Sequence, residues 1–497
     1  MAIERKSGIL LHISSLPNNE GIGTLGKEAR IFIDFLSMAG QRQWQILPLG
    51  HTGYGDSPYQ SFSTFAGNPL LISLSEMVSS GWLVEQQISA CHNLSKNKVD
   101  YGAVIVEKFK ILWEAWQGFN EVASREDKIA FSGFCSQNTE WLDDYALFME
   151  LKNVHQGEPW YSWENKYRIY NKESFTEFIS IHQVRILFWK FLQFVFSNQW
   201  RSLKLYANDH NIEIVGDLPL YIAHDSADAW ANSAVFQFDD NKNPTHVAGV
   251  PPDYFSETGQ LWGNPLYDWN YLRQTGFKWW LDRVGKCLEW YDMLRIDHFR
   301  GFAAYWSVPF TETTAINGQW VNAPGKELFD AIKQRFGSTP IIAEDLGVIT
   351  PDVEELRDSL GFPGMKILQF AFQPAKDNEY LPHNYVNPNC VCYSGTHDND
   401  TVLGWFDSLD PDTRESVKHY IPGGGESFAW KVMRLAWRST AAYAIAPMQD
   451  LLELGSEARM NVPGKPDGNW QWRFRNGDLT KELALQLKSM SRLYDRC

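Results

Sequence analysis

Three short apolar runs of this 497-residue chain end in acidic side chains that could do chemistry. Asp297 follows the run MLRI, Glu344 follows PIIA, and Asp398 lies in SGTHDND. A carboxyl group can attack an electrophilic carbon, donate a proton or accept one, depending on its pKa. Arg295 and His397 stand close to two of these acids and could balance their charge. These five residues are therefore the candidate centre of a reaction.

Three carboxylates gathered at one place would repel one another, which a purely structural site avoids. Arg295 would keep Asp297 ionised, whereas Glu344 would need a raised pKa to hold a proton at neutral pH. An ionised carboxylate and a protonated carboxyl flanking one anomeric carbon are what glycoside chemistry requires. Unrelated loop caps or surface ion pairs are the structural alternative for each acid taken alone. Their shared position at strand ends favours a reaction site.

The run GTHDND also raises the possibility of a metal site. His397, Asp398 and Asp400 carry atoms that divalent metals bind. The run has no matching pair of histidines at helical spacing, which many zinc sites on helices use. The sequence therefore predicts neither a metal nor another cofactor.

Eight β-rich runs alternate with helical patterns along the chain, which predicts parallel βαβ units. Eight such units predict an α/β fold, a closed (β/α)8 TIM barrel whose active groups lie at the C-terminal ends of the strands. Strand alternation places Arg295 and Asp297 on one face of their strand, and Leu294 and Ile296 on the other. The predicted strands are 8–16, 42–50, 212–222, 293–301, 340–347, 364–372, 390–398 and 442–450.

The spacing of these strands predicts one catalytic domain over residues 1–497, with two long insertions. Residues 54–210 carry amphipathic patterns and predict a mostly helical insertion between the second and third strands. Residues 223–290 predict a loop-rich insertion after the third strand. Within it, 249–270 is rich in Pro, Gly and aromatic residues and predicts a long active-site loop. We expect no separate C-terminal β domain.

The composition indicates which partners and which cellular compartment suit the protein. A net charge of −15 argues against nucleic acid or an anionic membrane surface as the main partner. There is no signal peptide pattern, and no apolar segment reaches the ~18 residues that a membrane span needs. Six cysteines without a CxxC pair predict reduced thiols in a cytoplasmic protein. The 22 Trp, 20 Tyr and 30 Phe include many in Gly- and Pro-rich segments, where rings could stack on sugars.

Several motifs together closely resemble amylomaltases, the 4-α-glucanotransferases or disproportionating enzymes of glycoside hydrolase family 77. The resemblance covers essentially the whole chain. It implies a barrel enzyme that moves α-1,4-glucan segments from a donor to the 4-hydroxyl of an acceptor glucan, glucose or maltose, with retention, through a covalent glycosyl-enzyme. The motifs are RIDHFRG (295–301), IIAEDLG (341–347), GTHDND (395–400), GDSPYQ (55–60), VGDLPLYI (215–222) and the segment 446–473.

The resemblance also implies a role for each residue of the site. Asp297 would be the nucleophile, Glu344 the general acid/base, and Asp398 the group that holds the donor sugar and stabilises the transition state. Arg295 and His397 would support these carboxylates. Binding of the glucan would fall to Tyr59, Asp217, Trp262, His298 and Asn461. One position departs from the family pattern, because His51 stands in LGHTGYGDSPYQ (49–60) where proline is expected.

Two other functions fit the same residues. A retaining α-glucan hydrolase of the amylase type would use the same three acids, and a non-catalytic glucan-binding protein would keep the cleft without the reaction. Transfer requires that water be excluded, for which the aromatic segment 249–270 is the candidate. The preference for transfer comes from the family resemblance.

Overall fold

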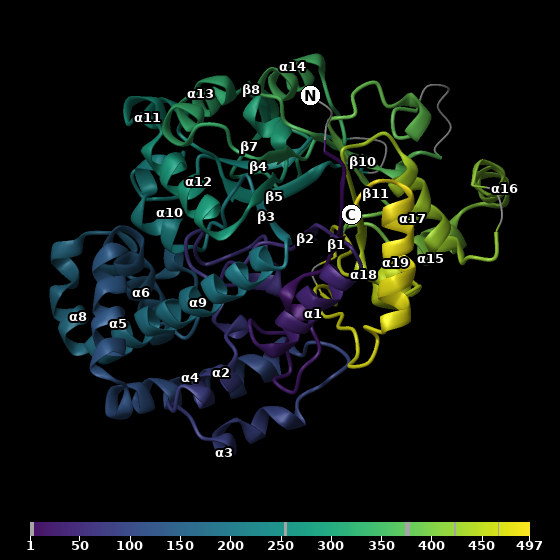
Figure 1. The fold of residues 1–497 in the computed structure, drawn as a ribbon. Helices are drawn as coiled ribbons and strands as arrows, with labels where there is room; N and C mark the ends of the chain where they lie inside the picture. The colour runs from purple at the N-terminus through teal and green to yellow at the C-terminus, as the bar shows by residue number, and fades with distance from the viewer. Residues whose placement is uncertain (1–3, 253–255, 373–377, 422–423, 466) are drawn as a thin grey trace.

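The computed structural model describes residues 4–252, 256–372, 378–421, 424–465 and 467–497. The strands of its main sheet are β1 Lys6–Leu10, β2 Gln43–Gln45, β3 Glu213–Leu218, β6 Met293–Ile296, β9 Ile341–Ala343, β10 Gly364–Ile367, β11 Cys390–Tyr393 and β12 Tyr443–Pro447. All pair in parallel, in the order β10-β11-β12-β1-β2-β3-β6-β9 (Figure 1). The Ala343 N–H donates to the Pro363 carbonyl at 2.9 Å and brings the two edges together. The expected (β/α)8 barrel is confirmed.

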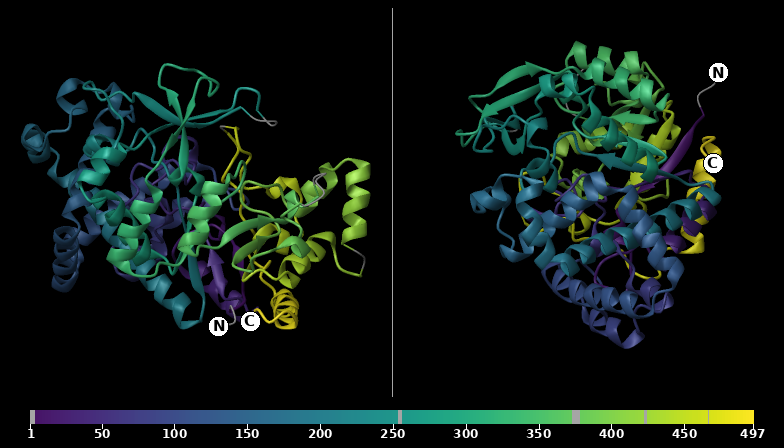
Figure 2. Two further views of the ribbon diagram at one scale, coloured as in Figure 1. Left: turned by 90° about the horizontal axis from the view of Figure 1, so that it is seen from above. Right: turned by 90° about the vertical axis from the view of Figure 1, so that its left-hand side faces the viewer.

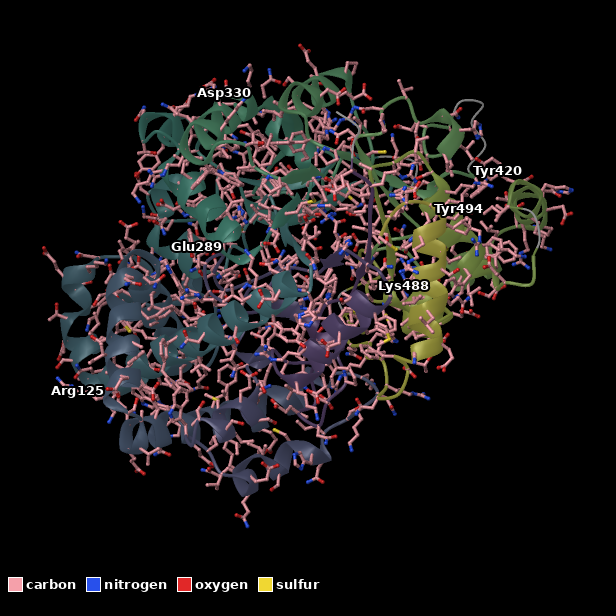
Figure 3. All side chains as sticks on the ribbon, in the orientation of Figure 1. Arg125, Glu289, Asp330, Tyr420, Lys488 and Tyr494 are labelled. Atoms are coloured by element: carbon pink, nitrogen blue, oxygen red, sulfur yellow. The ribbon has the colours of Figure 1, made fainter. Side chains whose placement is uncertain are left out.

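Amphipathic helices cover the outside of the barrel. In α1 (Lys27–Met38) Ala29, Phe32, Ile33 and Leu36 recur at three- and four-residue spacing and are buried. Side chains fill the space between the strands and these helices (Figure 3). The other helices of the second half are α13 Gly325–Phe336, α14 Pro351–Leu360, α15 Val402–Ser408, α17 Phe428–Arg438, α18 Met448–Leu451 and α19 Lys481–Leu493, while α16 Pro411–Tyr420 stands apart at the edge of the molecule (Figure 1).

The chain between β2 and β3 forms a group of helices at one side of the barrel (Figure 1). Side-chain caps start two of them, since Asp100 accepts a bond from Ala103 N at 3.1 Å and Ser124 accepts one from Asp127 N at 3.0 Å. The helices are α2 Leu74–Ser79, α3 Glu85–Ile88, α4 Tyr101–Val122, α5 Arg125–Gln137, α6 Thr139–Val154, α7 Asn165–Arg168, α8 Thr176–Ile181 and α9 Gln183–Asp209.

The structure corrects the prediction of a loop-rich segment over 223–290. This segment contains strands β4 (His246–Val250) and β5 (Gln260–Pro265) and helices α10 (Ala227–Ala231), α11 (Trp269–Gln274) and α12 (Lys278–Trp290). Of the long loop predicted over 249–270, residues 249–250 and 260–265 are strand, and 253–255 lie outside the described residues. The two strands join β7 (Ala304–Pro309) and β8 (Gln319–Asn322) in an antiparallel sheet, β5-β4-β7-β8. Since β7 follows β6 in the chain, no local pattern of 223–290 reveals this pairing.

Several barrel strands are shorter than predicted, and their ends decide where the polar residues go. The run 293–301 is a strand only to Ile296, because His298 has φ 52° and ψ 49°, in the left-handed region. A short 3-10 helix, Phe299–Phe302, follows. Asp297 and His298 thus leave the sheet at the C-terminal end of β6. In the left view of Figure 2 the small antiparallel sheet, in teal and green, lies at the top and the yellow C-terminal helix α19 lies at the bottom.

Arg496 lies at the other end of the barrel, where β12 and β1 begin side by side. Its side chain is 0% exposed, and burial lowers its pKa to about 9. The guanidinium donates from Nε to the Trp437 carbonyl at 2.7 Å and from Nη1 to Lys6 and Ala442, both at 3.1 Å. Nη2 donates to Ser439 at 3.2 Å and to Ala441 at 2.8 Å. The C-terminal residues thereby join the start of the first strand to the start of the last.

All six cysteines fall within the described ranges and carry free thiols. No helix in these ranges has the length and apolar character needed to cross a membrane.

Candidate active site

The register of neighbouring strands brings the predicted residues together. Where β3 pairs with β6, Asp217 lies opposite Arg295. Asp297 and Glu344 directly follow the paired ends of β6 and β9, and the Glu344 N–H still donates to the Ile296 carbonyl at 3.0 Å. Their side chains therefore emerge next to each other at the mouth of the barrel, the position typical of catalytic groups in this fold.

Arg295 links two of the carboxylates. Its Nη1 donates to both oxygens of Asp217, at 2.8 and 2.7 Å, and its Nη2 donates to Asp297 Oδ1 at 3.0 Å. The Tyr59 hydroxyl donates to Asp217 Oδ2 at 2.8 Å. A buried guanidinium held by a bidentate partner is a fixed positive charge beside Asp297. The Asp297 carboxylate is 31% exposed and available from the cleft.

Asp217, which is predicted to bind the glucan, contacts other side chains of the site. Its side chain is 0% exposed, and Arg295 and Tyr59 occupy its oxygens. The Asp217 carboxylate therefore faces these two side chains. The sequence could not reveal this, because the motif VGDLPLYI does not show which side chain competes for the acid.

Glu344 lies in surroundings that favour its protonated form. Burial, with the negative charge of Asp297 as the next cause, raises the pKa of Glu344 to about 8. Its oxygens accept two backbone bonds, from His298 N to Oε2 at 2.6 Å and from Leu346 N to Oε1 at 3.1 Å. The left-handed backbone of His298 turns this N–H toward the acid, so a strained residue positions the carboxyl. At neutral pH Glu344 can donate a proton.

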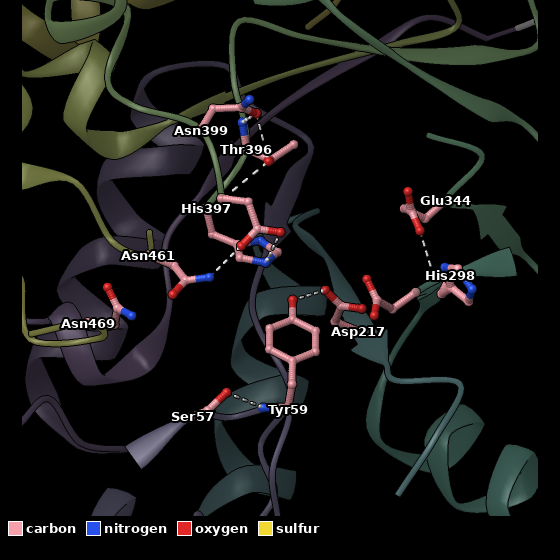
Figure 4. A network of polar contacts seen from close by, with 12 residues as sticks. Ser57, Tyr59, Asp217, His298, Glu344, Thr396, His397, Asn399, Asn461 and Asn469 are labelled. Atoms are coloured by element: carbon pink, nitrogen blue, oxygen red, sulfur yellow. Dashed lines mark hydrogen bonds and ion pairs between the residues drawn. The ribbon is translucent and has the colours of Figure 1, made fainter. Parts of the chain in front are cut away.

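Asp398 reaches the same opening from the loop after β11. Asn461 Nδ2 donates to Asp398 Oδ1 at 2.6 Å, and His397 Nε2 lies 3.4 Å from Oδ2. The Arg459 guanidinium holds the backbone carbonyl of Asp398 at 2.7 Å. Figure 4 shows Asn461 and His397 on one side of the opening and Glu344 on the other, with Tyr59 between them. Asp398 stays 45% exposed, so it can still accept bonds from a bound molecule.

A cleft of about 670 Å³ runs across this face of the barrel, within the size range of small-molecule sites. Trp262 lies on β5 of the small sheet, with its ring 4.8 Å from that of His298 and perpendicular to it, at 79°. Arg295 and Asp217 lie beneath the cleft. The predicted residues that line it are Tyr59, Trp262, Asp297, His298, His397, Asp398 and Asn461.

Two aromatic residues of the cleft were not predicted. Tyr221 ends the motif VGDLPLYI next to Ile222, and Trp470 lies in GNWQWR. Their aromatic character in a Gly- and Pro-rich sequence is the only signal that could have found them. A chain with 22 Trp and 20 Tyr offers too many such positions for that signal to select these two.

The departure at His51 has a structural explanation. Its side chain is buried, and its Nδ1 lies 2.8 Å from the Tyr145 hydroxyl of α6. Burial lowers the pKa of His51 to about 3, so the ring is neutral and serves as a hydrogen-bonding partner. Histidine therefore anchors the loop that carries Tyr59 to the helical insertion.

The metal alternative at His397, Asp398 and Asp400 finds no geometric support. The oxygens of Asp400 accept bonds from Thr401 N at 2.8 Å and from the Ser456 hydroxyl at 2.7 Å. Within the described ranges no group of three or more His, Cys, Asp or Glu side chains is arranged to hold a metal ion.

Comparison with known proteins agrees with this geometry. A family model described as 4-alpha-glucanotransferase matches residues 11–480. The 4-alpha-glucanotransferase of Thermus thermophilus is 48% identical over 100% of both chains, and that of Clostridium butyricum is 48% identical over 98% of this chain and 100% of its own. An amylomaltase from Streptococcus agalactiae, solved in complex with acarbose, has a TM-score of 0.96 at 39% identity, covering 99% of this chain and 100% of that one. The chain therefore belongs to the 4-alpha-glucanotransferase family.

Proposed function

We propose that the enzyme disproportionates malto-oligosaccharides, by transfer of an α-1,4-glucan segment to the 4-hydroxyl of another glucan, through a covalent intermediate on Asp297. The observation that carries this proposal is that the Arg295-bound Asp297 and Glu344, whose pKa is raised to about 8, follow the paired ends of β6 and β9. An ionised nucleophile next to a protonated acid is the starting state of a retaining glycosidase.

In the first step Glu344 gives its proton to the glycosidic oxygen while an Asp297 oxygen attacks the anomeric carbon. The bond from carbon to the leaving oxygen breaks, and its electron pair stays with that oxygen, which departs as the hydroxyl of the reducing-end fragment. A glycosyl ester on Asp297 remains. Arg295 favours the later breakdown of this ester, because it stabilises the Asp297 carboxylate that returns when the ester bond breaks.

In the second step the 4-hydroxyl of an acceptor attacks the same carbon. Glu344, now ionised, takes the hydroxyl proton, and the ester bond to Asp297 breaks. Two inversions leave the α-linkage unchanged, and they require the two carboxyl groups to lie ~5–5.5 Å apart. Glucose, maltose and longer malto-oligosaccharides carry the hydroxyl needed and are the proposed acceptors.

The other site residues hold the substrate or the machinery. Asp398, oriented by Asn461 and His397, accepts bonds from hydroxyls of the donor sugar. Trp262 and Tyr59 offer aromatic surface along the cleft. We reassign Asp217 from sugar binding to fixing Arg295, since its oxygens are already engaged.

We also propose that the enzyme works in the cytoplasm. The six free thiols suit a reducing compartment. Glucans of the cell interior would then be its substrates.

Incubation with maltotriose tests the proposal directly. Transfer should give glucose and a ladder of longer oligosaccharides while the total concentration of reducing ends stays constant. A steady rise in reducing ends would mean that water is the main acceptor, as in an amylase-type hydrolase. If maltotriose is not converted at all, the protein binds glucans without catalysing a reaction. Chromatography of the products combined with a reducing-end assay separates the three outcomes.

The pKa of Glu344 sets the alkaline limit of the reaction. Its pKa is raised to about 8, so the acid is protonated below that pH and loses its proton above it. We expect kcat/KM for maltotriose to fall about tenfold per pH unit above this value, because only the protonated form can assist the leaving group. Initial rates measured from neutral to alkaline pH check this. A decline that begins near the ordinary carboxyl value of 4.5 would contradict the assignment.

A further inference from the structure

Trp470 has a backbone conformation that large side chains rarely adopt. Its φ is 64°, in the left-handed region that favours glycine. The residue is only 5% exposed, yet it lines the cleft. Strain of this kind persists only where the surrounding structure imposes it, and it concentrates at functional sites.

Contacts on both sides of the residue impose this conformation. The Trp470 N–H donates to the Met460 carbonyl at 2.7 Å. On its other side the carbonyl of Trp470 accepts a bond at 3.0 Å from the hydroxyl of Tyr101, the first residue of α4. The Val99 N–H donates to the Gln471 carbonyl at 2.8 Å, so the segment before α4 runs alongside Trp470. The helical insertion thus clamps a residue of the cleft.

The ring of Trp470 packs against two aromatic rings of the site. Its centroid lies 5.9 Å from that of Tyr59 and 5.9 Å from that of His397. Tyr59 and His397 stack on each other at 5.2 Å and 20°. Three mutually packed rings leave little freedom for any one of them to turn.

Each of the two rings that Trp470 contacts positions a carboxylate. The Tyr59 hydroxyl bonds to Asp217, which holds Arg295 against Asp297. His397 Nε2 faces Asp398 Oδ2 at 3.4 Å. Among the described residues no hydrogen bond joins Trp470 to a carboxylate, so its influence runs through Tyr59 and His397.

We propose that Trp470 is a positioning residue for glucan transfer, held in a strained conformation by Tyr101 so that its indole fixes the Tyr59–His397 stack and, through it, both sets of carboxylates. The inference rests on the proposed function and adds to it a residue that acts on the geometry of the site. It predicts that loss of the ring slows the chemistry more than it weakens substrate binding.

Trp470→Gly removes the ring from a backbone that glycine adopts without strain. We expect kcat for maltotriose disproportionation to fall roughly 10²-fold, the size expected when catalytic groups shift by about 1 Å, with KM changed less than about threefold. Trp470→Phe retains an aromatic ring and should restore most of kcat. Tyr101→Phe removes only the clamping hydroxyl and should lower kcat about 2- to 10-fold, the size of one hydrogen bond.

Phe277→Gly is the matched control. Phe277 is also aromatic, buried and left-handed, with φ 57°, but it stands at the start of α12 and does not line the cleft. This variant should lose stability while retaining the kcat of the original enzyme.

Two results would overturn the proposal. One is a kcat of Trp470→Gly no lower than that of Phe277→Gly, which would make the ring a packing element. The other is a raised KM at unchanged kcat, which would mean that Trp470 binds the sugar directly. If Trp470→Gly does not fold, Tyr101→Phe still tests the proposal. An unchanged kcat in that variant would show that the Tyr101 hydroxyl does not hold Trp470 in a position that matters for transfer. Failure of the proposed function would appear separately, as unchanged maltotriose with the original enzyme.

Discussion

Asp297→Ala should lower kcat for maltotriose disproportionation on the order of 10⁶-fold, the size associated with loss of a covalent nucleophile. The fold should survive, because Arg295 keeps its bidentate pair with the buried Asp217 when Asp297 is removed. Thermal unfolding of the variant provides this control. The residual rate is measured from glucose release at high enzyme concentration.

The stereochemistry of a rescue reaction makes this test sharper. An α-glucosyl fluoride carries a leaving group that needs little protonation, and azide can enter the space left by the Asp297 carboxyl group. Attack from that face gives the β-azide with loss of fluoride, a single inversion. Retention of more than about 1% of the original rate with maltotriose would show that Asp297 is not the nucleophile.

Glu344→Ala is expected to give the second-largest loss, about 10²–10⁴-fold for transfer between unactivated glucans. Alanine is preferable to glutamine here because the backbone N–H groups of His298 and Leu346 both point at the carboxyl oxygens. A glutamine NH₂ group would have to face one of these donors. With the fluoride donor the first step no longer needs the acid, so the glycosyl-enzyme should form and accumulate.

The anomer formed with azide again shows which face of the anomeric carbon is open to attack. In Glu344→Ala the intermediate on Asp297 remains, so azide must attack from the opposite face and give the α-azide. Opposite anomers from the two variants would identify the nucleophile and the acid independently. The exposed Glu354 on α14 offers a control, since its change to alanine should leave both reactions unaffected. The same anomer from both variants would contradict the assigned roles.

Much of the barrel could be predicted because its strands are short apolar runs with polar residues at their C-terminal ends. The run 293–301 shows both the strength and the limit of that pattern. It locates β6 and places Asp297 at the barrel mouth, but the strand stops at Ile296, where the backbone turns left-handed at His298. The pairing of β4 with β7 escaped prediction, because β6 intervenes in the chain and only the folded barrel brings the two strands together.

The residues of the site could be predicted more completely than the contacts between them. Residue type and strand position select Asp297, Glu344 and Asp398. They do not show that Arg295 takes both oxygens of Asp217, because this depends on the register of two strands far apart in sequence. The left-handed backbone of Trp470 is likewise invisible in the sequence, where tryptophan gives no sign of positive φ.

The buried guanidinium of Arg496 has a consequence for how the protein matures. The carbonyls that it binds belong to the first residue of β1, to the end of α17 and to the residues between α17 and β12. All eight barrel strands precede Arg496 in the chain, so they are synthesised before this arginine can join the first of them to the last. A truncation just before Arg496 should therefore leave a barrel that opens easily between β12 and β1.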